Sequence, residues 1–139
     1  MEHVFVDTSF LVARFNRQDR HHAAASRFLQ SQRRPGAPAL RFFLSDYVFD
    51  ETVTTLLAKS GRHDVAVAAG RAIRGSQTLP LVRVEEPIFD AAWELFVSPG
   101  DKKWSFTDCT SFVLMDKLDV RRALSFDGNF REAGFVMLP

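Results

Sequence analysis

Short apolar runs rich in β-branched and aromatic residues alternate along this chain with longer segments of helical periodicity. The apolar runs lie at residues 4–6, 41–44, 79–84, 120–125 and 134–138. The spacing of apolar residues predicts helices over 8–15, 19–32, 45–60, 62–74, 87–96 and 107–118. Strands that alternate with helices are typical of a parallel sheet covered by helices on both faces. The alternation therefore predicts an α/β fold with a mainly parallel sheet of about five short strands.

Composition places the chain among globular proteins that bury a core of their own. It has 139 residues, of which 46% are hydrophobic and 25% are charged, and 14 of its aromatic residues are phenylalanines. A chain of this length buries roughly two-thirds of its unfolded surface. The composition excludes disordered, collagen-like and disulfide-scaffold proteins. We find no internal repeat and no linker, and we expect one domain over residues 1–139.

Cysteine content and the lengths of the apolar runs indicate a compartment. Cys109 is the only cysteine, which excludes an internal disulfide and a Cys/His zinc motif and suits a reducing environment. The N-terminus lacks the cationic start and long apolar region of a signal peptide. No apolar run approaches the roughly 18 residues of a membrane helix. We therefore expect a cytoplasmic protein with no membrane partner.

The net charge of +1 neither requires nor excludes a nucleic-acid partner. Basic residues do cluster along the chain, at Arg14, Arg17 and Arg20, at Arg33-Arg34, at Lys102-Lys103 and at Arg121-Arg122. Taken singly, each cluster is more simply interpreted as a solvated face.

Four carboxylates occupy positions from which the predicted fold can bring them together. Asp7 and Asp127 directly follow predicted strands. Asp108 lies in the first turn of one predicted helix, and Glu51 lies within another. In open parallel sheets, sites form beyond the carboxyl ends of the strands. Because crowded carboxylates repel one another and are the ligands of hard cations, the set predicts a divalent-metal site.

Each acid also has a purely structural interpretation. Asp7 suits the N-cap of the helix that follows it, and Asp108 suits a capping box with Ser105. Asp127 precedes Gly128 in a common turn pair. Glu51 lies nearly opposite the apolar side predicted for its helix, so periodicity alone makes it a solvent-facing residue. The residues by themselves leave both interpretations open.

Four stretches spread over almost the whole chain add a second kind of signal. They read VFVDTS at 4–9, SDYVFDET at 45–52, WSFTDCTSF at 104–112 and SFDGNF at 125–130. The segment at 133–135, AGF, fits the same pattern. Any one stretch is a weak signal, but all four in this order resemble the PIN domain of VapC toxins, which belong to bacterial and archaeal toxin–antitoxin pairs.

The resemblance implies an α/β/α sandwich and a ribonuclease that depends on Mg²⁺ or Mn²⁺. It implies that the metal-binding and catalytic residues are Asp7, Glu51, Asp108 and Asp127. Hydroxyl positions that support such a site match Thr8, Ser9, Ser105 and Thr107. Many relatives carry an acid or a histidine where this chain has Asn129, whose carbonyl oxygen can still accept but adds no charge. That departure leaves the occupancy of a second metal open.

The resemblance also suggests how such an enzyme acts and what it binds. We expect hydrolysis of RNA to 5′-phosphate and 3′-hydroxyl ends, a homodimer, and a small antitoxin that blocks the cleft, with exposed phenylalanines on the first helices and on the Glu51 helix as the contact surface. The residues expected to contact RNA are Arg14, Arg17, Lys102, Lys103 and Trp104. The pair His21-His22 is interpreted as surface residues near a loop, because adjacent helical side chains point about 100° apart.

Two other functions remain as alternatives. One is a DNA-directed nuclease similar to flap endonucleases, which the short chain makes the weaker interpretation. The other is a degenerate PIN module that only binds RNA or protein, which the intact set of four acids argues against. A DxDxT phosphatase is excluded, because Asp7-Thr8-Ser9 lacks the second aspartate.

Overall fold

Five parallel strands form one sheet in the computed structural model, which describes residues 1–139. The strand order is β3-β2-β1-β4-β5, and every neighbouring pair is parallel. The predicted parallel sheet is therefore confirmed. The strands are β1 (Glu2–Val6), β2 (Leu40–Ser45), β3 (Leu81–Val82), β4 (Arg122–Leu124) and β5 (Val136–Leu138).

Seven helices connect and cover the strands. Six of them lie close to the predicted segments. As predicted, Ser45 caps α3, and Gly61, with a φ of 66°, ends it in the left-handed conformation. The seventh, α7, has only four residues and no periodic pattern to reveal it. The helices are α1 (Thr8–Phe15), α2 (His22–Gln32), α3 (Asp46–Ser60), α4 (His63–Gly75), α5 (Glu86–Val97), α6 (Phe106–Lys117) and α7 (Asn129–Glu132).

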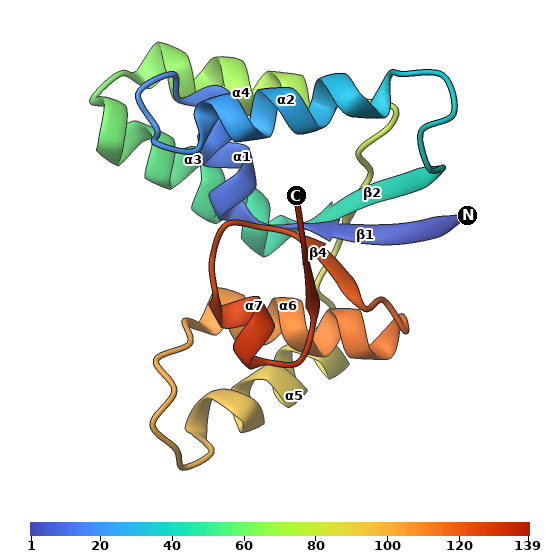
Figure 1. The fold of residues 1–139 in the computed structure, drawn as a ribbon. Helices are drawn as coiled ribbons and strands as arrows, with labels where there is room; N and C mark the ends of the chain where they lie inside the picture. The colour runs from blue at the N-terminus through green and yellow to red at the C-terminus, as the bar shows by residue number, and fades with distance from the viewer.

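The helices form two layers with the sheet between them (Figure 1). Helices α1 to α4 lie on one side of the sheet, and α5 to α7 lie on the other. This is the α/β/α sandwich that the sequence predicts. The chain adds β2 and β3 on one side of β1 and then β4 and β5 on the other side. The direction of strand addition therefore reverses between β1 and β4.

The core surrounds the central strand β1. Val4 and Phe5 are fully buried, and Val6 is nearly so. The Phe5 ring packs edge-on against Phe43 of β2 and stacks against Phe130 of α7, with centroids 5.4 and 6.3 Å apart. The contact with Phe130 joins the layer of α5 to α7 to the sheet. The phenylalanine-rich composition thus supplies the core that fixes β1 and the residues after it.

The exposed aromatic side chains lie on α5. Phe89, Trp93 and Phe96 are each at least 41% exposed, and Val97 beside them is 50% exposed. The phenylalanines of α1 and α3 are buried or half-buried. The expectation that exposed phenylalanines lie on the first helices and the Glu51 helix is therefore wrong. No helix combines the length and the apolar character needed to cross a membrane.

Candidate active site

The reversal of strand order places two of the predicted acids side by side. β1 and β4 are neighbours, with Val6 opposite Leu124, and the Asp7 amide continues the ladder by donating to the Leu124 carbonyl at 3.0 Å. Asp7 directly follows β1, and Asp127 lies three residues beyond β4. A ligand site is expected at such a reversal in an open parallel sheet. The topology thus brings residues 120 positions apart to one edge.

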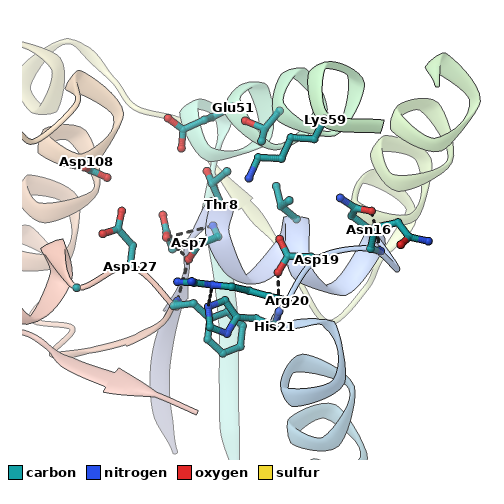
Figure 2. A pocket seen from close by; sticks show the side chains of 16 residues that line it. Asp7, Thr8, Asn16, Asp19, Arg20, His21, Glu51, Lys59, Asp108 and Asp127 are labelled. Carbon is teal, nitrogen blue, oxygen red and sulfur yellow. Dashed lines mark hydrogen bonds between the residues drawn. The ribbon is translucent and has the colours of Figure 1, made fainter. Parts of the chain in front are cut away.

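A polar cavity of about 820 Å³ opens at this edge of the sheet. All four predicted acids line it, together with Thr8 and Ser9 (Figure 2). They come from four separate segments: the end of β1, α3, α6 and the loop after β4. The remaining lining residues are Val12, Asn16, Gln18, Asp19, Arg20, His21, Thr55, Lys59, Phe126 and Gly128.

Two serine hydroxyls fix the Asp7 carboxylate. Its Oδ2 atom accepts hydrogen bonds from Ser9 Oγ at 2.8 Å and from Ser125 Oγ at 2.9 Å. The Ser9 amide donates to the same oxygen at 3.3 Å, so the predicted N-cap is confirmed. The two hydroxyls in turn accept from the amides of Phe126 and Asp127, each at 2.9 Å. The network ties the end of β1 to the loop that carries Asp127.

Asn129 bridges the other two aspartates. Its side-chain Nδ2 donates to Asp108 Oδ2 at 3.1 Å and to Asp127 Oδ2 at 3.4 Å. Asp108 also completes the predicted capping box, because its Oδ2 accepts from the Ser105 amide and its own amide donates to Ser105 Oγ. Asn129 therefore acts as a donor to two carboxylates. The sequence suggested a role for the Asn129 carbonyl oxygen as an acceptor, whereas the structure shows its side-chain nitrogen as a donor.

Glu51 faces the cavity because the buried side of α3 differs from the one predicted. The buried residues of α3 are Val48, Thr52 and Leu56, whereas Leu57, counted on the apolar side by periodicity, is 43% exposed. This shift moves Glu51 to the edge of the buried face, in line with Thr55 and Lys59, which also line the cavity. The solvent-facing interpretation of Glu51 is therefore wrong.

Crowding and burial raise the proton affinity of the acids. Burial raises the pKa of Asp7 to about 6, although the Ser9 and Ser125 hydroxyls act in the opposite direction. Burial also raises the pKa of Glu51, with added repulsion from the charges of Asp108 and Asp127. The pKa of Asp108 is raised by burial and then by Asp127. A bound cation removes this penalty by favouring the charged forms.

The donor set fits a hydrated hard cation. No three acidic, histidine or cysteine side chains converge closely enough to hold one ion alone. Mg²⁺ normally takes one or two carboxylates and keeps several waters, for which the cavity has room. Asp7 and Asp108 make their hydrogen bonds through Oδ2 and leave Oδ1 without a protein partner. The buried Thr8 hydroxyl also lacks a partner and points toward Glu51 (Figure 2).

All five residues expected to contact RNA lie outside the lining of this cavity. Arg14 lies over the Phe15 ring, and Lys102 pairs with Glu132 at 3.2 Å. Trp104 packs edge-on against Phe112 in the α5–α6 layer. The structure therefore does not bring Arg14, Lys102, Lys103, Trp104 or Arg17 into the lining of the carboxylate cavity.

Thr107, expected to support the acids, also lies outside the cavity lining. Its carbonyl oxygen accepts hydrogen bonds from the hydroxyls of Thr110 and Ser111, at 2.6 and 3.0 Å. Those contacts stabilise the first turns of α6. Thr107 therefore stabilises the helix that carries Asp108 and does not line the cavity.

Sequence reasoning missed several residues that do line the cavity. His21 stacks on Phe126 with centroids 4.3 Å apart and planes within 4°, and Arg20 Nε donates to His21 Nε2. His21 is a half-buried residue next to a loop, as expected, but its place in the cavity lining was not foreseen. Lys59 was detectable, since it lies eight residues after Glu51 on the same helical face. Ser125 was part of a recognised stretch, but its contact with Asp7 depends on the pairing of β1 with β4.

Comparison with known proteins identifies the family of the chain. The PIN domain family matches residues 4–136. A curated relative, the 23S rRNA-specific endonuclease VapC20 of Mycobacterium tuberculosis (strains CDC 1551 and H37Rv), is 39% identical over 133 residues, which cover 96% of this chain and 95% of the relative.

Two solved structures extend the comparison. The crystal structure of Mycobacterium tuberculosis VapC20, described as a toxin that cleaves the sarcin–ricin loop, has a TM-score of 0.84 at 38% identity over 96% of each chain. VapBC2 from Rickettsia felis, bound to a DNA fragment from their promoter, has a TM-score of 0.61 at 10% identity, covering 98% of this chain and 97% of that one, which shows likeness of fold alone. With a family match that spans nearly the whole chain and a relative 39% identical, this chain belongs to the PIN-domain family and to its VapC-like members.

Proposed function

We propose that this chain is a metal-dependent endoribonuclease, the toxin of a toxin–antitoxin pair, and that residues 1–139 act as one PIN domain. The observation that carries the proposal is the meeting of four acids from four segments at one cavity. The 39% identity to an rRNA endonuclease gives the substrate class. A cavity of carboxylates repels a polyanion unless a cation is present, so the proposal includes one.

The residues proposed to hold the cation, Mg²⁺ or Mn²⁺, are Asp7, Asp108 and Asp127, in part through the waters that the ion keeps, with Glu51 directly or through water. Such an ion lowers the pKa of water and offsets charge on a phosphodiester. The protein's own contribution is to orient the ligands. Ser9 and Ser125 hold Asp7 through one oxygen, and Asn129 holds Asp108 and Asp127. Asp7 and Asp108 each keep one carboxylate oxygen without a protein hydrogen bond, whereas both oxygens of Asp127 accept from Asn129.

Glu51 is proposed to take the proton of the attacking water. Its carboxylate lines the cavity, and burial raises its pKa, although the Thr8 hydroxyl acts in the opposite direction. The raised pKa brings its proton affinity closer to neutral pH. Attack in line at phosphorus then expels the 3′-oxygen, which leaves a 5′-phosphate and a 3′-hydroxyl. This chemistry needs no 2′-hydroxyl, so the preference for RNA must come from groove shape and contacts.

The sarcin–ricin loop of 23S rRNA is the proposed first substrate to test. VapC20, which shares 38% of its residues with this chain in the solved structure, is described as cleaving that loop. A folded RNA hairpin presents splayed bases and a crowded backbone, both of which a polar open cavity can contact. Fragment ends and cleavage position in this hairpin therefore report on both the chemistry and the target.

The proposed partners are a VapB-type antitoxin and a second copy of this chain. VapC toxins pair with VapB antitoxins, as in the VapBC2 complex. The exposed face of α5, made of Phe89, Trp93, Phe96 and Val97, is an apolar patch of the kind that marks protein interfaces. We propose that this face forms the homodimer. Light scattering of the purified protein and of Trp93→Asp tests the dimer, which the substitution is expected to break.

The test of the activity compares three proteins on sarcin–ricin loop RNA: wild type, Asp7→Asn and Asp50→Asn. Asp50 is exposed, lies next to Glu51 on α3 and does not line the cavity, so it controls for the loss of one charge. Wild type and Asp50→Asn are expected to cut with Mg²⁺ or Mn²⁺ and not with EDTA, and Asp7→Asn is expected not to cut.

Other outcomes of this test favour other functions. Cyclic phosphate ends contradict the proposed hydrolysis. Faster cutting of DNA than of RNA favours a flap-type nuclease. If the wild-type protein neither cuts RNA nor binds metal, a PIN module that only binds RNA or protein is favoured.

A further inference from the structure

A second cavity adjoins the carboxylate cavity along α1 and α3. Its volume is about 500 Å³, and it shares Asn16, Gln18 and Lys59 with the first cavity. The shared residues make the two cavities parts of one groove. We call the second part the side cavity, lined by Phe15, Asn16, Arg17, Gln18, Lys59, Ser60, Arg62 and Val65.

The two parts of the groove differ in charge. The carboxylate cavity is lined by five acids, the four of the site and Asp19. The side cavity has no acid in its lining and contains Arg17, Lys59 and Arg62. Arg62 is already paired with Asp64 at 2.6 Å. Arg17 and Lys59 take part in no salt bridge, so their charges are free for a ligand.

Lys59 joins the two parts of the groove. Glu51, Thr55 and Lys59 lie on one face of α3, and Lys59 is about 12 Å from Glu51 along the helix axis at 1.5 Å per residue. The Lys59 side chain reaches back along the cavity toward Thr8 (Figure 2). Its ammonium group therefore lies between the acids and the side cavity.

A nucleic-acid strand carries one negative charge per nucleotide, so cutting one phosphodiester leaves neighbouring phosphates to be accommodated. The acids repel those neighbours, and a cation at the scissile phosphate does not reach them. We propose that the side cavity binds the RNA phosphates on one side of the scissile one, through Arg17 and Lys59. This inference rests on the proposed ribonuclease function and names the path that the substrate takes from the site.

Two double variants of equal charge change test the proposal. Arg17→Ala with Lys59→Ala removes the two basic side chains of the side cavity that take part in no salt bridge. Arg33→Ala with Arg34→Ala removes two exposed arginines from the loop after α2, which line neither cavity. Cleavage is measured with both double variants made in the wild-type protein. Affinity for fluorescent sarcin–ricin loop RNA is measured by anisotropy with both made in the Asp7→Asn protein, at about 50 to 200 mM salt.

The side-cavity variant is expected to weaken RNA binding several-fold and to raise KM more than it lowers kcat. The slope of log K against log salt is expected to become shallower by about 1.4 to 1.8, which is 0.7 to 0.9 for each of two lost phosphate contacts. The charge-keeping variant, Arg17→Lys with Lys59→Arg, is expected to restore the slope. The control pair is expected to keep the wild-type slope.

Two results overturn the proposal. One is an unchanged slope in the side-cavity variant, which assigns those cations to another partner such as an acidic segment of an antitoxin. The other is an equal change in both double variants, which indicates a general effect of net charge. In either case, cleavage by the wild-type protein still supports the proposed ribonuclease function. If the wild-type protein does not cleave RNA, the proposed function itself is contradicted.

Discussion

Ser125 Oγ lies 2.9 Å from Asp7 Oδ2, and this contact joins two segments that are 118 residues apart. Ser125 is 1% exposed and follows β4 directly, while Asp7 follows β1. The same hydroxyl accepts a hydrogen bond from the Asp127 amide at 2.9 Å. One buried serine therefore sets the position of two of the proposed metal ligands.

Removing this hydroxyl is expected to reduce activity beyond its effect on stability. Ser125→Ala takes away a donor that lowers the pKa of Asp7, so the acid limb of the pH–rate profile is expected to move to higher pH. Ser111→Ala is the matched control, because Ser111 is fully buried and its hydroxyl bonds only to the Thr107 carbonyl. Each substitution is expected to cost about 1 kcal/mol of folding free energy. A shifted acid limb in Ser111→Ala as well contradicts the assignment.

The raised pKa of Asp7 makes a prediction about stability. A rise from 3.8 to about 6 means that the folded, metal-free protein holds this proton more tightly than the unfolded chain. Stability then falls as pH rises through the window from about 4 to 6 and stays low above it, with a contribution of about 3 kcal/mol. Urea unfolding in EDTA is expected to give lower stability at pH 7 than at pH 5.

Asp7→Asn removes that charge and is expected to stabilise the metal-free protein at pH 7 while abolishing cleavage. The amide oxygen can still accept from Ser9 and Ser125, so the network survives. Urea unfolding at pH 7 in EDTA measures the difference. A variant that is less stable than wild type under these conditions shows that burial of the Asp7 charge is not a cost.

Neighbouring acids on α3 are expected to differ sharply. Glu51→Gln keeps the size of the side chain and removes the proposed proton acceptor, so kcat is expected to fall by about 100-fold or more. Asp50→Asn, one residue earlier and exposed, is expected to leave kcat within about twofold, since Asp50 acts on Glu51 only through its charge. Equal losses in the two variants contradict a direct role for Glu51.

Asn129→Asp tests whether the bridging amide offsets repulsion. The change replaces a donor to Asp108 and Asp127 by a third negative charge. We expect the metal-free variant to unfold at a lower temperature than wild type and to gain more from added Mn²⁺. Differential scanning calorimetry with and without Mn²⁺ measures both. An unchanged gain on adding metal indicates that Asn129 lies too far from the ion to influence it.

The layered fold and the helix caps at Asp7 and Asp108 could be predicted because each rests on a local signal. The alternation of strands and helices fixes the fold class, and the N-cap at Asp7 and the capping box at Asp108 follow from neighbouring residues. Only the resemblance placed Glu51 at the site, and the periodicity of apolar residues argued against it. The periodicity fails because Thr52, a polar residue, occupies a fully buried position. With Thr52 on the buried side of α3, Glu51 lies at the edge of that side and lines the cavity.

The walls of the cavity were harder to predict because they depend on tertiary contacts. His21 reaches the cavity only because it stacks on Phe126, more than 100 positions away in the chain. The contact between Ser125 and Asp7 requires the register of β1 with β4. Basic residues near the acids in sequence, such as Lys102 and Lys103, lie on the loop before α6 and outside the cavity.

The central claim is that the cavity acids act by holding a divalent cation that cleavage requires. The most direct measurement is the rate of sarcin–ricin loop cleavage as a function of Mn²⁺ concentration, for wild type and for Asp127→Asn. Wild type is expected to show no cleavage without metal and a saturating rise with Mn²⁺, and Asp127→Asn to need far more metal or to remain inactive. Cleavage by wild type at full rate in EDTA, or identical Mn²⁺ curves for the two proteins, contradicts the account.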